Sequence, residues 1–149
     1  MADGLLPARA SDVLELDEVC GYVGKRANKV WTWTALCRRT RQIVAFVNGD
    51  RSEATCRTLW GRIPKGYRGC RTFSDFWKAY ANVFSDGCHQ SVGKETGETA
   101  HMERWNNTLR QRVGRMVRKT LSFSKCVTWH DGMIHWFVVT YNSSLSVNT

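Results

Sequence analysis

A chain of 149 residues with 42% hydrophobic residues and only two prolines is long enough for one domain and too apolar for a disordered protein. It has no apolar run near the roughly 20 residues that a membrane span needs, and we expect no signal peptide, hence a cytoplasmic protein. Lysine and arginine total 22 against 13 acidic residues. The net charge of +9 favours a polyanionic partner, nucleic acid before an anionic membrane surface.

The first half of the chain predicts a three-stranded antiparallel meander. Strands are expected over residues 13–19, 30–37 and 42–48, where β-branched and aromatic residues are frequent. Gly- and Lys-rich residues 21–29 and basic residues 38–41 are expected to form turns. Short connections between successive strands favour antiparallel pairing.

The second half alternates helices with short strands. The expected elements are a helix over 53–63, a strand over 71–74, a helix over 76–84, a strand over 88–92, a loop over 93–100, a helix over 101–120 and an amphipathic segment over 131–142. Ser52 is the expected N-cap of the first helix. The order predicts an α/β fold, in which a mixed sheet of a meander plus crossover strands is covered by helices. One domain over 13–142 would lie between a lead-in over 1–12 and a tail over 143–149.

The six cysteines show no CxxC pair and no spacing typical of zinc ligands. Without a secretory signal, a disulfide framework is also disfavoured. We expect free, mostly buried thiols.

Two aspartates stand where carboxylates can form a site. Asp17 lies in the middle of an apolar strand, where an ionised carboxylate is rare unless it is paired or bound to a metal. The alternative places Asp17 on the solvent face, and Glu18 could equally be the functional acid. Asp75 follows a short strand, at the kind of strand end where ligand sites form in α/β sheets, or it simply caps the next helix.

The helix expected over 101–120 carries an acid beside a basic surface. At roughly 100° per residue, Glu103 and Arg110 share a face next to the apolar stripe. Asn106 lies at the edge of that stripe, where a buried amide needs a partner. Six basic residues against Glu103 alone would repel one another unless a phosphate backbone lay alongside. A solvated basic face is the alternative.

Five sequence blocks match one known family in the same order. They are LDEVC-x-YVG at 16–24, NGDRSEATCR at 48–57, SDFWKAY at 74–80, ER-x-N-x-TLRQR at 103–112 and RKTLSFSK at 118–125. Together they resemble the transposases of bacterial insertion sequence one, specifically the product of the second reading frame, over about residues 14–140. The family tends to have glycine where this chain has Phe76.

The resemblance implies a ribonuclease H-like fold with a DDE triad at Asp17, Asp75 and Glu103. These carboxylates would hold two Mg²⁺ or Mn²⁺ ions, hard cations that prefer oxygen ligands. The implied activity is that of a DNA transposase: water cuts a DNA strand to leave a 3′-hydroxyl, which then attacks target DNA. The expected DNA-binding residues are Arg110, Asn106, Arg104, Arg115 and Lys78.

The resemblance also implies partners. The family's upstream zinc-binding and helix-turn-helix region is expected to be missing from this chain and to be supplied by the upstream reading frame, as a fusion or a partner. The expected assembly also contains transposon ends, target DNA and further copies of the chain. It would act at the bacterial nucleoid. Two alternatives stay open: another ribonuclease H-like nuclease acting on RNA–DNA hybrids or junctions, and an inactive or regulatory fragment that binds DNA non-specifically.

Overall fold

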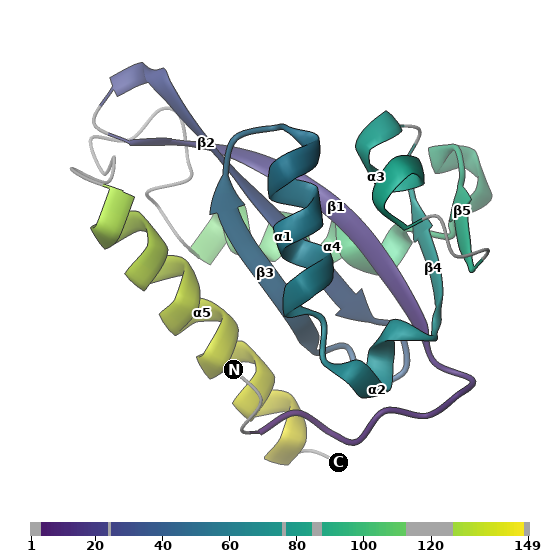
Figure 1. Ribbon diagram of the computed structural model, residues 1–149. Helices are drawn as coiled ribbons and strands as arrows, with labels where there is room; N and C mark the ends of the chain where they lie inside the picture. Colours follow the sequence, from purple (N-terminus) through teal and green to yellow (C-terminus); the bar gives the residue numbers. More distant parts are fainter. Residues whose placement is uncertain (1–3, 24, 76, 85–87, 113–126, 148–149) are drawn as a thin grey trace.

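A five-stranded mixed sheet, in the spatial order β3-β2-β1-β4-β5, forms the centre of the computed structural model (Figure 1). The structure describes residues 4–23, 25–75, 77–84, 88–112 and 127–147. The strands are β1 (Val13–Val23), β2 (Lys25–Cys37), β3 (Ile43–Gly49), β4 (Arg71–Ser74) and β5 (His89–Ser91). β1, β2 and β3 pair antiparallel, whereas β4 lies parallel to β1 and β5 parallel to β4. The predicted meander plus crossover strands is confirmed.

The turn expected over residues 21–29 is wrong for most of its length. Gly21 pairs with Val30 and Tyr22 with Lys29, so β1 and β2 continue as a long hairpin. The local preference of glycine and lysine for turns is overridden here by cross-strand pairing, on which strand formation mainly depends. The hairpin extends beyond the helices at one end of the sheet (Figure 1).

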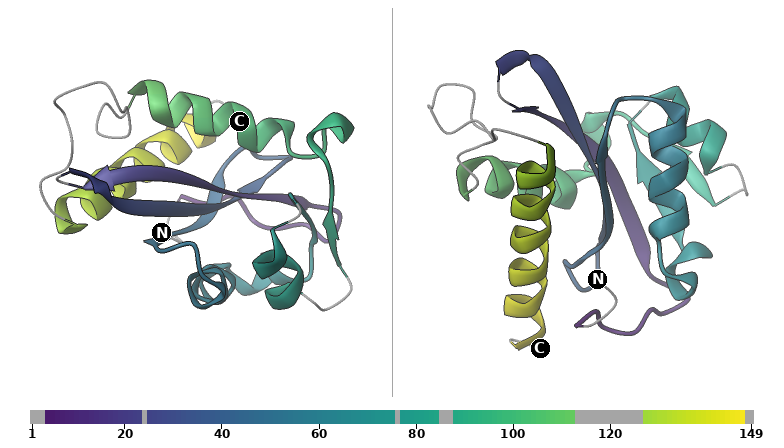
Figure 2. Two further views of the ribbon diagram at one scale, coloured as in Figure 1. Left: turned by 90° about the horizontal axis from the view of Figure 1, so that it is seen from above. Right: turned by 60° about the vertical axis from the view of Figure 1, so that its left-hand side comes forward.

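Helices cover both faces of the sheet (Figure 2). On one face lie α1 (Glu53–Arg62), α2 (Lys65–Arg68) and α3 (Lys78–Val83), and on the other lie α4 (Ala100–Arg112) and α5 (Val127–Val147). Successive side chains of β1 point to opposite faces of the sheet, because side chains alternate along a strand. Leu14 and Leu16 belong to the core under α1 to α3, whereas Val19 belongs to the core under α4 and α5.

The predicted helices form with shifted ends. Ser52 caps α1 as expected, with its hydroxyl oxygen accepting from the Thr55 N–H at 3.3 Å. The helix expected from residue 76 begins at Lys78, and α5 is longer at both ends than the segment expected over 131–142. Residues 113–120 of the expected long helix lie outside the described residues, as does Phe76. None of the helices described has the length and apolar character to cross a membrane.

Candidate metal centre

Carboxylates from β1 and from the end of β4 come together at the centre of the sheet. One oxygen each from Asp17, Glu18 and Asp75 lies within 4.8 Å of the others. β4 pairs with β1 only as far as the Glu15–Phe73 pair, and two residues later on the two parallel strands stand Asp17 and Asp75. The end of β4 thus leaves a gap beside β1 in which the carboxyl groups meet.

A cavity of about 220 Å³ opens at this gap and includes the third predicted acid. Its charged lining consists of Asp17, Glu18, Asp75, Glu103, Arg51, Lys94 and Arg110. The structure therefore brings the three predicted carboxylates, from β1, the β4 end and α4, to one cavity. Arg110 lines the same cavity as Glu103, in keeping with their shared helix face.

Asp17 is a carboxylate held by neutral donors. Its Oδ1 accepts from the Glu18 N–H at 2.9 Å and its Oδ2 from the Asn106 side-chain amide at 2.7 Å. Burial, together with the negative charges of Glu18 and Asp75, raises the pKa of Asp17 to about 7. A divalent cation among these carboxylates would favour the ionised form, because an opposite charge stabilises a carboxylate. The clustered carboxylate oxygens are hard donors of the kind that such a cation prefers.

Glu18 differs because a cation of the protein already compensates it. Its Oε1 accepts from Arg51 at 3.0 and 2.9 Å, and its Oε2 accepts from the Tyr80 hydroxyl at 2.5 Å. Burial nevertheless raises the pKa of Glu18. Among the residues described, ion pairs are found for Glu18 but not for the three predicted acids of the cavity. Because Glu18 is already paired with Arg51, Asp17 is the better candidate for a metal ligand.

Asp75 also shapes the start of α3. Its Oδ1 accepts from the Trp77 N–H at 3.0 Å, two residues along the chain. Asp75 therefore stabilises the turn before α3, which begins at Lys78 after the N-cap position of Trp77. The expectation that Asp75 caps the helix is therefore wrong, because α3 has its N-cap at Trp77 without a side-chain cap, and Asp75 holds the preceding turn instead. The same carboxylate lies in the cluster with Asp17 and Glu18.

The start of α4 is fixed by Glu15, a residue that the sequence analysis missed. Its Oε1 accepts from the backbone N–H groups of His101 and Met102 at 2.9 and 3.0 Å. Its Oε2 lies 2.7 Å from His101 Nδ1 and accepts from Arg38 Nε at 3.1 Å. A carboxylate at a helix N-terminus satisfies free N–H groups and the helix dipole. Glu15 thereby holds the helical turn that carries Glu103.

Asn106 has the partner that its position on the helix demanded. The side chain is 3% exposed, and the bond to Asp17 ties α4 to β1 one turn after Glu103. Arg104 and Lys78 are exposed and are not among the residues that line the cavity. Arg115 lies outside the described residues. Of the members of the predicted DNA-binding set that the structure describes, Arg110 lines the cavity and Asn106 binds Asp17, whereas Arg104 and Lys78 do neither.

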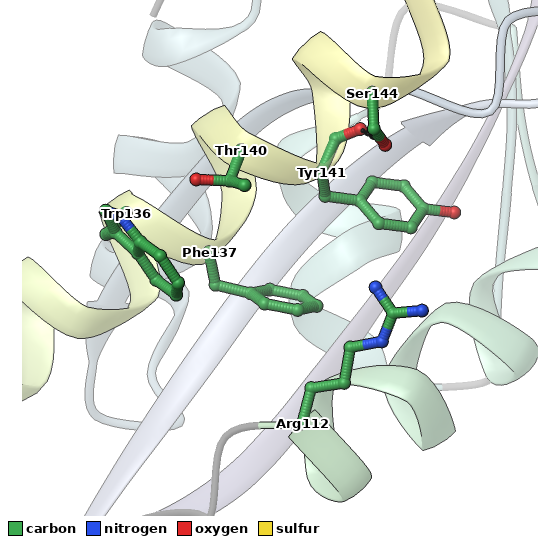
Figure 3. A pocket seen from close by; sticks show the side chains of 6 residues that line it. All are labelled: Arg112, Trp136, Phe137, Thr140, Tyr141 and Ser144. Carbon is green, nitrogen blue, oxygen red and sulfur yellow. Dashed lines mark hydrogen bonds between the residues drawn. The ribbon is translucent and has the colours of Figure 1, made fainter. Parts of the chain in front are cut away.

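A second cavity of about 220 Å³ lies between the end of α4 and α5. In Figure 3 the Arg112 side chain extends from α4 towards the rings of Phe137 and Tyr141 on α5. The described residues that line it carry no carboxylate. It therefore offers none of the hard oxygen ligands that the first cavity gathers.

Comparison with known proteins identifies a family. The family model described as "IS1 transposase" matches residues 12–142. The chain is 35% identical to the insertion element iso-IS1n protein InsB of Shigella dysenteriae, covering 85% of this chain and 93% of that protein. It is 36% identical to the insertion element IS1 protein InsB of Shigella flexneri, covering 80% of this chain and 88% of that protein.

Two solved structures share the fold. The HTLV-2 integrase catalytic core domain, solved in complex with magnesium, matches with a TM-score of 0.57 at 14% identity, over 92% of this chain and 86% of that one. A chain of the simian T-cell lymphotropic virus intasome, solved with the PP2A regulatory subunit B56 gamma, matches with a TM-score of 0.56 at 12% identity. That match covers 77% of this chain and 45% of the intasome chain. The mixed sheet between helical layers is thus the ribonuclease H-like fold of integrase catalytic cores.

Proposed function

The chain belongs to the IS1 transposase family, and we propose that Asp17, Asp75 and Glu103 are the acidic triad with which this DDE transposase cuts and joins DNA strands. The observation that carries the proposal is their convergence, from β1, the β4 end and α4, on one cavity. Asp17 and Asp75 offer oxygens within 4.8 Å of each other.

The proposed cofactor is Mg²⁺ or Mn²⁺, with two ions held by Asp17, Asp75 and Glu103. The pKa of Asp17 is raised first by burial and then by the negative charges of Glu18 and Asp75, and a bound cation would offset both effects by stabilising the ionised carboxylate, which supports this donor set. The magnesium complex of the HTLV-2 core, which shares the fold, is consistent with it. Bound cations would polarise the reacting phosphate and stabilise charge on the attacking and leaving oxygens.

The protein's own residues would hold the reactants in place. Asn106 fixes the orientation of Asp17, and Glu15 fixes the turn that bears Glu103. Arg110 and Lys94 would bring positive charge to the phosphate oxygens. In the first step water attacks a phosphodiester and the 3′-oxygen leaves, giving a 3′-hydroxyl. In the second step that hydroxyl attacks a phosphodiester of target DNA, so one centre can serve both steps with a change of nucleophile.

The wider assembly is also a proposal. Arg104, Arg115 and Lys78, with Arg110 and Asn106, would contact the DNA backbone around the centre, which suits the net charge of +9. Recognition of transposon ends would come from the upstream zinc-binding and helix-turn-helix region. We expect several copies to act together on DNA, in the cytoplasm at the nucleoid.

A branched DNA substrate tests the triad without end recognition. A Y-shaped duplex fixes the reacting phosphodiester at its junction, and cleavage and joining there are measured by gel with Mg²⁺. We expect Asp75→Asn to lower the rate by at least about 10²-fold while DNA binding persists, and Asp131→Asn, which changes an exposed aspartate of α5, to leave it unchanged.

The outcomes separate the candidate functions. Retained activity in Asp75→Asn would remove Asp75 from the triad. Faster cleavage of an RNA–DNA hybrid than of the branched DNA would favour a hybrid nuclease. Salt-sensitive DNA binding with no metal-dependent cleavage, also after fusion to the upstream region, would leave a non-specific DNA-binding fragment.

A further inference from the structure

A third cavity, of about 360 Å³, adjoins the metal centre on the side of α3 and β5. It is lined by Arg51, Asp75, Trp77, Val92, Gly93 and Lys94. Three of these, Arg51, Asp75 and Lys94, also line the cavity of the carboxylates. The two cavities are therefore neighbours that share these three residues.

The aromatic residue of this cavity is exposed and yet held in place. Trp77 is 36% exposed, and its backbone N–H is bound by the Asp75 carboxylate. The Arg51 guanidinium lies over its ring, 4.3 Å from the centroid. Tryptophan is enriched at binding surfaces because its indole offers a large flat apolar face, and at Trp77 this face is held in place beside a cavity.

Arg51 in turn is fixed from several sides. Its guanidinium lies over the Trp31 ring as well, at 4.8 Å, and donates two hydrogen bonds to Glu18. Glu18 is itself held by Tyr80. A buried carboxylate, a cation and two indoles thus form one rigid unit, which we call the Arg51 platform and define as Glu18, Arg51, Trp31 and Trp77.

We propose that this third cavity binds a single unpaired nucleobase of the DNA strand, next to the reacting phosphate and against Trp77 of the Arg51 platform. The proposal rests on the proposed function, because the phosphate is placed by the carboxylates. An aromatic side chain stacks on the π-face of any base, and Lys94 and Arg51 supply positive charge for the flanking phosphates. A base within a duplex is already stacked, so the base that enters is unpaired, as at a junction or a frayed end.

A double-mutant cycle between protein and DNA tests the contact. Binding of the Y-shaped DNA is measured with Ca²⁺ in place of Mg²⁺, using DNA that is intact or that carries an abasic site at one of the nucleotides flanking the junction. We expect Trp77→Ala to weaken binding of intact DNA about tenfold, and to have no effect when the abasic site occupies one particular position. Trp77→Phe should retain most of the affinity.

The controls separate stacking from damage to the fold. The bond to Asp75 uses the backbone of Trp77 and survives the substitution. Trp136→Ala removes a tryptophan that is 63% exposed on α5 and should leave the affinity unchanged at every position. Equal thermal unfolding of the variants and the wild type, followed by circular dichroism, would show that folding is intact.

A loss of affinity in Trp77→Ala that is the same for all abasic positions, or no loss at all, would overturn the nucleobase site. Such a result combined with an inactive Asp75→Asn would leave the triad standing and remove only the base contact. Activity retained in Asp75→Asn would count against the triad itself.

Discussion

Asp17 and Glu18 are successive residues of β1, yet their carboxylates lie on opposite sides of the strand and have different partners. Asp17 is bound by neutral donors, the Glu18 N–H and the Asn106 amide of α4. Glu18 reaches the other helical layer, where Arg51 and Tyr80 satisfy its oxygens. On one side the carboxylate of Glu18 is paired with Arg51 and Tyr80, whereas on the other side Asp17 has no ion pair among the described residues, which suits its proposed role as a metal ligand. This difference predicts that Asp17 binds the metal and that Glu18 supports the structure around it.

The largest expected effect sharpens that comparison directly. Asp17→Asn removes a proposed metal ligand and should lower the rate on branched DNA by about 10³-fold. Glu18→Gln removes the ion pair that holds Arg51 and should lower the rate by about 10-fold. Rates at several Mg²⁺ concentrations measure both, with circular dichroism as the control for folding. Similar losses in the two variants would contradict the division of roles.

The second prediction concerns the support of α4. Glu15→Ala leaves Arg38 without its buried partner and the first N–H groups of α4 without an acceptor. Such a loss should lower the free energy of unfolding by about 3 kcal/mol. Urea unfolding measures it, and Glu53→Ala, at an exposed ion pair of α1, should cost less than about 1 kcal/mol. Equal costs would show that Glu15 does not anchor the helix.

The third prediction concerns how the stability of the protein depends on pH, because protonation of Asp17 and metal binding at Asp17 exclude each other. The pKa of Asp17 is about 7 in the folded protein against a usual value of 3.8, so the folded form holds the proton more tightly. In EDTA, the free energy of unfolding should therefore fall by about 4 kcal/mol as the pH rises from about 4 to about 8, and then level off. The raised pKa of Glu18 acts in the same direction.

Melting temperatures at pH 5 and pH 8, with EDTA or with Mg²⁺, measure this effect. Mg²⁺ should restore stability at pH 8, because it binds the ionised carboxylates of the folded state. Asp17→Asn should flatten the pH dependence and weaken the response to Mg²⁺. A wild-type melting temperature at pH 8 that Mg²⁺ does not raise would argue against a metal at these carboxylates.

Local sequence patterns were sufficient to predict the positions of the candidate site residues. The strand position of Asp17, the strand-end position of Asp75 and the helix face of Glu103 and Arg110 follow from local patterns. The need of Asn106 for a partner follows in the same way, and its bond to Asp17 confirms it. With the family resemblance, these patterns led to the residues that the structure brings to one cavity.

The supporting contacts could not be predicted because they join distant parts of the chain. Glu15 lies 86 residues from His101 and Glu18 lies 33 residues from Arg51, separations at which periodicity carries no information. One signal was present: Glu15 stands two residues before Asp17 and therefore on the same side of β1. A charged residue on the covered side of a strand needs a partner, and in the structure that partner is the start of α4.

The smallest expected effect tests the neutral partner of Asp17. Asn106→Ala removes the amide that orients the carboxylate but leaves all the proposed ligands, so it should weaken the apparent Mg²⁺ affinity about tenfold with a smaller change in the rate at saturating Mg²⁺. Asn107→Ala, the exposed neighbour on α4, is the matched control. If the two variants behave alike, the Asn106–Asp17 bond does not prepare the carboxylate for a metal. If only Asn106→Ala demands more Mg²⁺, the neutral amide on this side of β1 orients a carboxylate whose negative charge the cation compensates.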